Sequence, residues 1–93
     1  MKITYDLNKR ALTLKERGLD FMDAALVFAG EVYEFEDTRK DYGEKRMIAV
    51  GYLTHRMVII GYVQRCKTRH IFSMRKANER ESDREDPRRQ QRA

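Results

Sequence analysis

The sequence predicts an α+β fold: two N-terminal helices packed on a four-stranded, mostly antiparallel sheet, with another helix at the C-terminus. Three observations lead to this prediction. Apolar residues at helical spacing are confined to the first third of the chain, alternating strand-like segments follow, and a polar stretch without an apolar stripe ends it. Helices followed by a block of strands are typical of α+β proteins. With 93 residues the chain forms one domain, which we place at 1–87 and follow with a disordered basic tail at 88–93.

The first helix is expected over residues 7–17. Asp6 precedes it and can accept a hydrogen bond from a free backbone N–H of the first turn. Gly18 follows it, at the position where a left-handed C-cap is favoured. The apolar stripe that should pack on the protein consists of Ala11 with Leu14 or Leu7.

The second helix is expected between Asp20, its N-cap, and Gly30, where it ends. It is the more apolar of the two helices, with Phe21, Ala24, Ala25 and Phe28 among its residues. We therefore expect this helix to cover the sheet.

The strands are expected at 32–35, 46–53, 57–63 and 69–75. Residues 3–5 are β-prone and add a short strand or an extended arm. The segment 57–63 is apolar on both faces, as a central strand is. Alternation in 69–75 puts Arg69, Ser73 and Arg75 on one face, and the core face then holds His70, Phe72 and Met74. The polar segments 36–45 and 77–86 are expected to form a loop and the C-terminal helix.

Charge is segregated along the chain. Residues 31–44 hold six acidic and two basic side chains, whereas residues 45–76 hold eight basic side chains and no Asp or Glu. The formal net charge is +5. A basic sheet favours a polyanionic partner, with nucleic acid as the first candidate. Small basic domains are also common without such a role, and segregation of the charge makes that alternative weaker.

Several classes of protein and site are disfavoured. Cys66 is the one cysteine, so no internal disulfide forms, which fits a reducing compartment. No apolar run reaches the roughly 20 residues that span a bilayer, and the first ten residues lack the apolar region of a signal peptide. We expect a cytoplasmic protein. His55 and His70 are far apart and no metal-site spacing occurs, so we expect no metal and no cofactor.

The sharpest local feature is a group of polar and basic residues in the last strand, namely Arg69, Ser73, Arg75 and Lys76. The planar fork of an arginine can bind a phosphate through two hydrogen bonds, and its charge persists at any physiological pH. Several such forks could stabilise the charge that grows on a phosphodiester during cleavage. A solvated strand face with scattered cations explains the same residues equally well.

Four short motifs occur in order between Ile3 and Glu81. They are Tyr5-Asp6-Leu7-Asn8-Lys9, Gly18-Leu19-Asp20-Phe21 followed by Val27-Phe28, Gly43-Glu44-Lys45-Arg46, and Arg69-His70-Ile71-Phe72-Ser73-Met74-Arg75-Lys76-Ala77. In this order they resemble the BrnT family, the ribonuclease toxins of type II toxin–antitoxin modules. The resemblance implies a RelE-like fold, in which helices cover one face of the sheet and the other face binds and cuts RNA without a metal.

The resemblance also implies the chemistry and the partners. The RNA 2′-hydroxyl would attack the adjacent phosphate, and RNA cleavage would inhibit translation and growth. A BrnA-type ribbon-helix-helix antitoxin would cover the basic sheet in an assembly of two toxins and two antitoxins. Operator DNA would be contacted only through the antitoxin, and no membrane is involved.

The site expected from these residues combines the strand group with the motif arginine of the second strand. The catalytic residues would be Arg46, Arg69, Ser73 and Arg75. The residues that bind RNA would be Lys45, Arg65, Lys67 and Lys76. Arg39 lies in the acidic loop, and we expect it to be dispensable.

One departure from the family pattern keeps another function open. Where the family has Lys-His-Gly, this chain has Glu16-Arg17-Gly18, so any general base at that position is missing. The alternative function is a module without catalysis, which holds nucleic acid or an acidic partner on its basic sheet.

Overall fold

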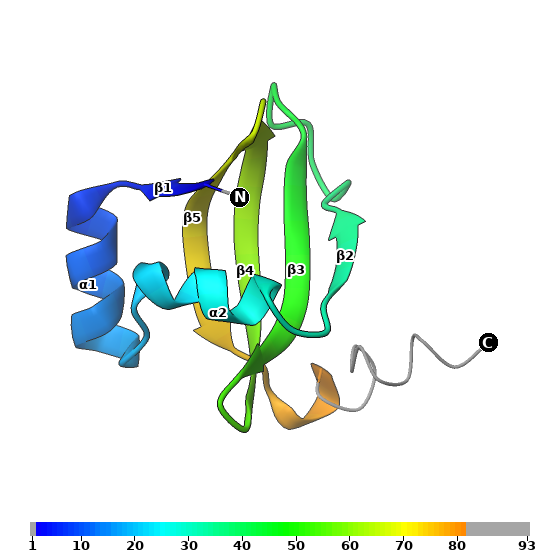
Figure 1. Cartoon of the computed structure of the whole chain (residues 1–93). Coiled ribbons are helices and arrows are strands. Elements are labelled where there is room, and N and C mark those ends of the chain that lie inside the picture. The colour runs from blue at the N-terminus through cyan, green and yellow to red at the C-terminus, as the bar shows by residue number, and fades with distance from the viewer. Residues whose placement is uncertain (1, 82–93) are drawn as a thin grey trace.

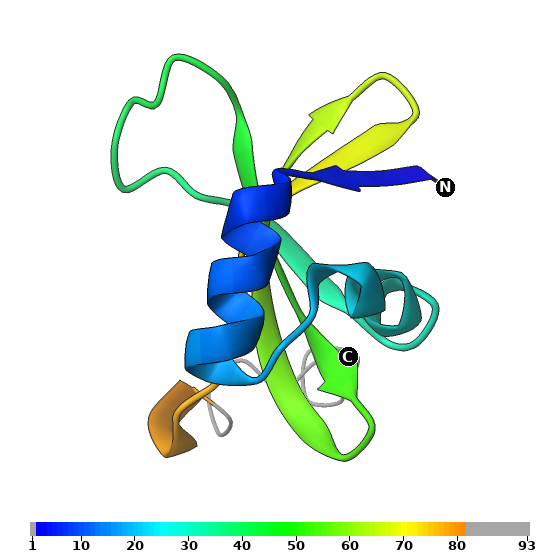
Figure 2. The same ribbon diagram turned by 90° about the vertical axis from the view of Figure 1, so that its left-hand side faces the viewer.

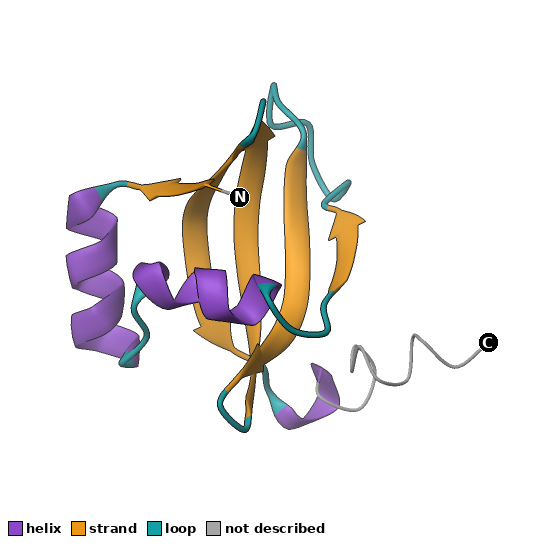
Figure 3. Ribbon diagram, viewed as in Figure 1, coloured by secondary structure: helices purple, strands orange, loops and turns teal. Residues whose placement is uncertain are grey.

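The structure, a computed structural model, describes residues 2–81 as a five-stranded sheet with helical segments before β2 and a short helical turn after the last strand (Figures 1 and 3). The elements are β1 (Lys2–Tyr5), α1 (Leu7–Arg17), the 3-10 helix η1 (Phe21–Asp23), α2 (Ala24–Phe28), β2 (Tyr33–Glu36), β3 (Arg46–Leu53), β4 (Arg56–Arg65) and β5 (Thr68–Lys76). The α+β class and the order of the elements are as predicted. The helix α2 crosses one face of the sheet, and α1 stands beside the edge formed by β1 and β5 (Figure 1).

The sheet has one strand more than predicted. Its order is β1-β5-β4-β3-β2, and every neighbouring pair is antiparallel except β1 with β5. The additional strand is the N-terminal arm, which runs parallel to β5 from the pair Lys2↔Thr68 to the pair Tyr5↔Ile71. A parallel pair joined across most of the chain leaves no hairpin signal in the sequence, which is why the arm could not be assigned to the sheet beforehand.

The core lies between α2 and the sheet, as predicted. Phe21, Ala24 and Val27 are fully buried against the inner side chains of β3, β4 and β5. Gly51 of β3 lets this helix approach closely, because a Cβ there would stand 2.6 Å from Cγ1 of Val27. We call this side of the sheet the helix face and the other side the open face. The central strand β4 is buried on both faces, as its sequence predicts.

The helix α1 has the predicted caps. The side chain of Asp6 accepts a hydrogen bond from the backbone N–H of Lys9 at 3.0 Å, and Gly18 ends the helix at a φ of +69°. The sequence thus places the start and stop of this helix correctly from capping chemistry alone.

The side of α1 that packs on the protein was predicted wrongly. No residue of α1 is buried, and Leu7 and Leu14 of the expected apolar stripe are 71% and 45% exposed. The inner side is polar instead: Arg10 donates two hydrogen bonds to the carboxylate of Asp20, at 2.8 and 3.0 Å. Arg17 donates to the backbone oxygen of Met74 at 3.1 Å. Ion pairs and backbone contacts, which periodicity does not reveal, therefore orient this helix.

The C-terminal helix is described only in part. Residues 79–81 form a helical turn after Asn78. The rest of the helix predicted at 77–86, and the tail predicted at 88–93, lie outside the described residues.

Candidate active site

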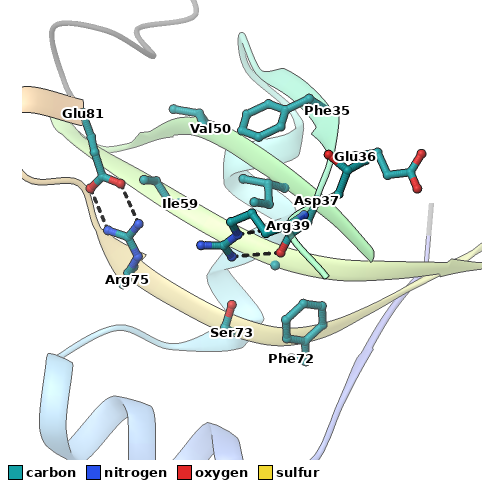
Figure 4. A pocket seen from close by; sticks show the side chains of 13 residues that line it. Phe35, Glu36, Asp37, Arg39, Val50, Ile59, Phe72, Ser73, Arg75 and Glu81 are labelled. Atoms are coloured by element: carbon teal, nitrogen blue, oxygen red, sulfur yellow. Dashed lines mark hydrogen bonds and ion pairs between the residues drawn. The ribbon is translucent and has the colours of Figure 1, made fainter. Parts of the chain in front are cut away.

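A pocket of about 390 Å³ lies on the open face of the sheet (Figure 4). Its floor is apolar and consists of Ile48, Val50, Ile59 and Gly61, from β3 and β4. The loop 37–45 and the C-terminal turn both project on this side of the sheet, away from α2 (Figure 2). They contribute Arg39 and Glu81 to the wall of the pocket, whereas β5 contributes Ser73 and Arg75.

A β-bulge brings Ser73 and Arg75 to the open face. Tyr62 of β4 pairs with Ile71, but the preceding residue Gly61 pairs with Ser73, so Phe72 is an extra residue in β5. An extra residue shifts the alternation of side chains by one position. Odd-numbered residues of β5 therefore face the helix before the bulge and the open face after it.

This bulge overturns three expected placements in β5. Arg69 was expected to share a face with Ser73 and Arg75, but it lies on the helix face, where its guanidinium carbon is 4.1 Å from the ring centre of Phe28. His70 was expected on the core face, but it lies on the opposite side from Arg69, where its Nδ1 is 3.0 Å from Oγ1 of Thr4. Phe72 was also expected on the core face, but it lines the pocket on the open face. All three errors come from applying strict alternation to a strand that contains a bulge.

Arg69 is part of a half-buried polar cluster beneath α2. Its guanidinium lies 3.5 Å from Glu34 and 5.1 Å from the ring centre of Tyr62. The hydroxyl of Tyr62 donates to the carboxylate of Glu34. Burial, and then this hydrogen bond, raise the pKa of Tyr62 above its ordinary value. The cluster joins α2, β2, β4 and β5, so the position of Arg69 is that of a packing residue and not of a pocket residue.

Arg75 lies at the pocket and is paired with a carboxylate. Its two Nη atoms donate to the two carboxylate oxygens of Glu81, at 2.7 and 2.6 Å (Figure 4). These hydrogen bonds raise the pKa of Arg75, whereas burial and the nearby charge of Arg39 oppose that rise. Both arginines line the pocket.

Arg39 reaches the pocket from the loop. Its Nε and Nη2 atoms donate to the carboxylate oxygens of Asp37, each at 2.9 Å. The hydroxyl of Tyr42 donates to the same carboxylate at 3.0 Å. These bonds, above all those from Arg39, hold the pKa of Asp37 well below its usual range. The sequence prediction treated Arg39 as remote, and the structure places it on the pocket wall.

Arg46 is stacked between two aromatic rings at the loop end of the open face. Its guanidinium carbon is 4.3 Å from the ring centre of Tyr42 and 4.7 Å from that of Phe72. Its Nε atom is buried and has no hydrogen-bond partner among the described residues. Phe72 also lines the pocket, so the stack of Arg46 with the two rings borders the pocket on the side of Phe72.

The four residues expected to bind RNA fall into two groups. Lys45 precedes β3, and Arg65 and Lys67 lie at the β4–β5 turn; both segments are at the same end of the sheet (Figure 1). Arg65 there lies 3.6 Å from Glu44, so an acidic residue of the loop offsets part of the basic charge. Lys76 is at the opposite end, where it pairs with Val58. The structure thus separates Lys76 from the other three.

Within residues 2–81, no group of three or more His, Cys, Asp or Glu side chains is arranged to hold a metal ion. No helix in this part of the chain is long and apolar enough to cross a membrane.

Residues 5–81 match the family model described as "Ribonuclease toxin, BrnT, of type II toxin-antitoxin system". The chain belongs to the BrnT family. The crystal structure of the Brucella abortus ribonuclease toxin BrnT is similar, with 27% sequence identity and a TM-score of 0.68. The similarity covers 85% of this chain and 99% of the Brucella chain. No curated protein matches the sequence. Membership of a type II toxin family implies an antitoxin as protein partner and RNA as substrate.

Two pocket residues, Glu81 and Arg39, were missed by the sequence prediction, although the sequence holds a signal for each. Asn78 and Glu81 have the spacing of a capping box, and the structure shows both of its hydrogen bonds, from Asn78 N to Glu81 Oε1 and from Glu81 N to Asn78 Oδ1. Such a box fixes the turn that follows β5 and thereby the carboxylate beside Arg75. Arg39 had a weaker signal, an acidic residue two positions before it, directly after β2.

Proposed function

We propose that this BrnT protein is an endoribonuclease toxin that binds RNA on the open face of the sheet and cleaves it at the pocket, without a metal. The observation that carries the proposal is the meeting of Ser73, Arg75 and Arg39 around an apolar floor, on the face that α2 leaves uncovered. The apolar floor suits the flat surface of a base or a ribose, and the arginines suit a phosphate.

The proposed reaction is attack of the RNA 2′-hydroxyl on the adjacent phosphorus. The bond from the 2′-oxygen to phosphorus forms as the bond to the 5′-oxygen breaks, which gives a 2′,3′-cyclic phosphate and a 5′-hydroxyl. One proton leaves the 2′-oxygen and one is taken up by the 5′-oxygen. Arg75 and Arg39 would stabilise the negative charge on the equatorial phosphate oxygens, and Ser73 would donate a hydrogen bond to one of them. Arg46, stacked at the pocket wall, would bind a neighbouring phosphate.

The pocket lining constrains how the proton is taken from the 2′-hydroxyl. No histidine and no lysine is among the described residues that line it. Asp37 is ionised but is a weak base, because Arg39 and Tyr42 hold its pKa low. Most of the rate enhancement should therefore come from stabilisation of the transition state by the arginines, and not from a strong general base.

The proposal extends to the path of the RNA strand and to the antitoxin. Lys45, Arg65 and Lys67 gather at the end of the sheet next to Arg46, so we infer that the strand runs from the pocket toward this end. A BrnA-type ribbon-helix-helix antitoxin would cover the open face in an assembly of two toxins and two antitoxins. It alone would contact operator DNA. RNA cleavage by the free toxin, in the cytoplasm, would stop translation and growth.

A cleavage assay with purified protein tests the proposal. A single-stranded RNA is incubated with the protein with and without EDTA, beside a matched strand carrying 2′-deoxyribose at each nucleotide. We expect cleavage of the RNA in both buffers, products ending in 2′,3′-cyclic phosphate, and an intact deoxy strand. Tight RNA binding without any cleavage would contradict the proposal and favour the binding module. Loss of cleavage in EDTA would contradict the metal-free mechanism alone.

A further inference from the structure

The carboxylate of Glu81 accepts hydrogen bonds from the guanidinium of Arg75 in the way that a phosphate would. Both of its oxygens accept hydrogen bonds from the two Nη atoms of Arg75, at 2.7 and 2.6 Å. A guanidinium binds two oxygens of a phosphate through the same parallel geometry. In Figure 4 the fork of Arg75 points toward Glu81, so both of its Nη atoms already donate to a carboxylate.

The charge of the pocket lining reinforces this point. Among the described residues, two arginines and three carboxylates line it, so this part of the lining has a formal charge of −1. A phosphodiester group is also negative, and such a lining would repel it. If RNA binds in this pocket, one of the carboxylates must therefore separate from its arginine when the RNA enters.

The two carboxylates that bind arginines differ in how firmly they are held. The side chain of Asp37 is 6% exposed and accepts hydrogen bonds from Tyr42 and from the backbone and side chain of Arg39. The side chain of Glu81 is 14% exposed and accepts hydrogen bonds from Arg75 and from the backbone N–H of Asn78. Asp37 and its arginine lie two residues apart in one loop, whereas Glu81 and Arg75 belong to different elements, the turn 79–81 and β5. Glu81 is thus the carboxylate that can separate from its arginine when the turn moves.

We propose that Glu81 is a built-in competitor of RNA: it binds Arg75 in the free protein, and an RNA phosphate replaces it there. This inference rests on the proposed function and adds a form of regulation to the same site. The free toxin is held in a state of low RNA affinity. Any partner or RNA that draws the turn 79–81 away from β5 exposes the Arg75 fork and raises the affinity.

Two variants of one turn test the competition. Glu81→Gln removes the charge next to Arg75 and keeps a side chain that can still complete the capping box with Asn78. Glu79→Gln removes the same charge two residues away, on an exposed side chain. Affinity for a fluorescent single-stranded oligonucleotide with 2′-deoxyribose, which cannot be cleaved, is measured by anisotropy at one fixed salt concentration.

We expect Glu81→Gln to bind this strand about three- to fivefold more tightly than Glu79→Gln, the range that a partly exposed ion pair supports. The difference between the two variants should vanish when Arg75 is also replaced by Ala. An equal gain in RNA affinity for both variants would show a long-range effect of charge and would overturn the inference. A slower cleavage by Glu81→Gln with unchanged affinity would overturn it too, because Glu81 would then position Arg75 for catalysis. If neither the parent protein nor any variant binds RNA, the proposed function itself fails.

Discussion

Ser73 lies directly over Gly61: its Oγ is 2.5 Å from the position that a Cβ on this glycine would occupy. Two ring atoms of Phe72 approach the same position, at 2.7 and 2.8 Å. The bulge in β5 thus turns two successive side chains over the one residue of β4 that has none. The shape of the pocket floor, and the reach of Ser73 into the pocket, both depend on this missing side chain.

Gly61→Ala should destabilise the protein by about 1–3 kcal/mol, the usual cost of overpacking a closed site. It should also displace Ser73 and lower RNA cleavage. Urea unfolding measures the first effect and the cleavage assay the second. Gly30→Ala is the matched control, because its Cβ would meet a single atom within 4 Å, at an ordinary 3.7 Å. Equal stability of the Gly61 and Gly30 variants would contradict this account of the bulge.

Phe28→Ala should remove the side chain that ties α2 to the sheet. Phe28 is buried, lies edge-on to Tyr62 with ring centres 5.3 Å apart, and faces the guanidinium of Arg69. Replacing a buried phenylalanine by alanine costs about 3–5 kcal/mol, which in so small a domain can abolish folding. Leu26 is in the same helix but 64% exposed, and its replacement by Ala should stay within about 0.5 kcal/mol. A Phe28→Ala melting temperature equal to that of the parent would show that this packing contributes nothing.

Acid should destabilise the protein partly through Asp37. Its pKa is lowered in the folded state, chiefly by the hydrogen bonds from Arg39. Below a pH of about 4, the unfolded chain therefore binds more protons at Asp37 than the folded protein does. The contribution of Asp37 to the free energy of unfolding is fully present above that pH and is lost as the pH falls toward the pKa in the folded state. Asp37→Asn should flatten the dependence of melting temperature on pH below about 4. Asp41→Asn, in the same loop, is the control. Part of the dependence should remain, because Arg10 also lowers the pKa of Asp20.

The elements of this fold could be predicted because their signals are local. Caps at Asp6 and Gly18 located α1, and alternation located β3 with both of its ends. The site could be predicted only in part, because its geometry depends on one inserted residue and on pairings distant in sequence. The bulge at Phe72 separates Arg69 from Ser73, and no sequence period reveals it. The segregation of charge along the chain is also partly offset in space, since Glu34 and Glu44 of the acidic segment pair with Arg69 and Arg65.

RNA binding should be mainly electrostatic, and its salt dependence should locate the contacts. Each phosphate contact on a single strand contributes about −0.7 to the slope of log affinity against log salt. Arg39→Ala should make that slope shallower by about 0.7, because Arg39 lines the pocket. Arg69→Ala should leave the slope unchanged and lower the melting temperature instead, since Arg69 packs under α2. An affinity that barely responds to salt would contradict the phosphate-binding role of the open face.

Arg75→Ala should lower the rate of RNA cleavage by about a hundredfold or more, while RNA binding weakens far less. Arg75 remains protonated, so it cannot serve as a base, and its role is to donate hydrogen bonds to the phosphate as charge develops there. One donor placed for the transition state is worth about 2.7–4 kcal/mol, and its loss appears in kcat more than in binding. Arg75→Lys should not restore the rate, because a point charge does not replace two parallel donors. The comparison uses single-turnover cleavage of one RNA strand at saturating protein. Lys15→Ala, on the exposed side of α1, removes the same charge far from the pocket and should cleave at the parent rate. If Arg75→Ala also cleaves at the parent rate, the chemistry does not take place at this pocket.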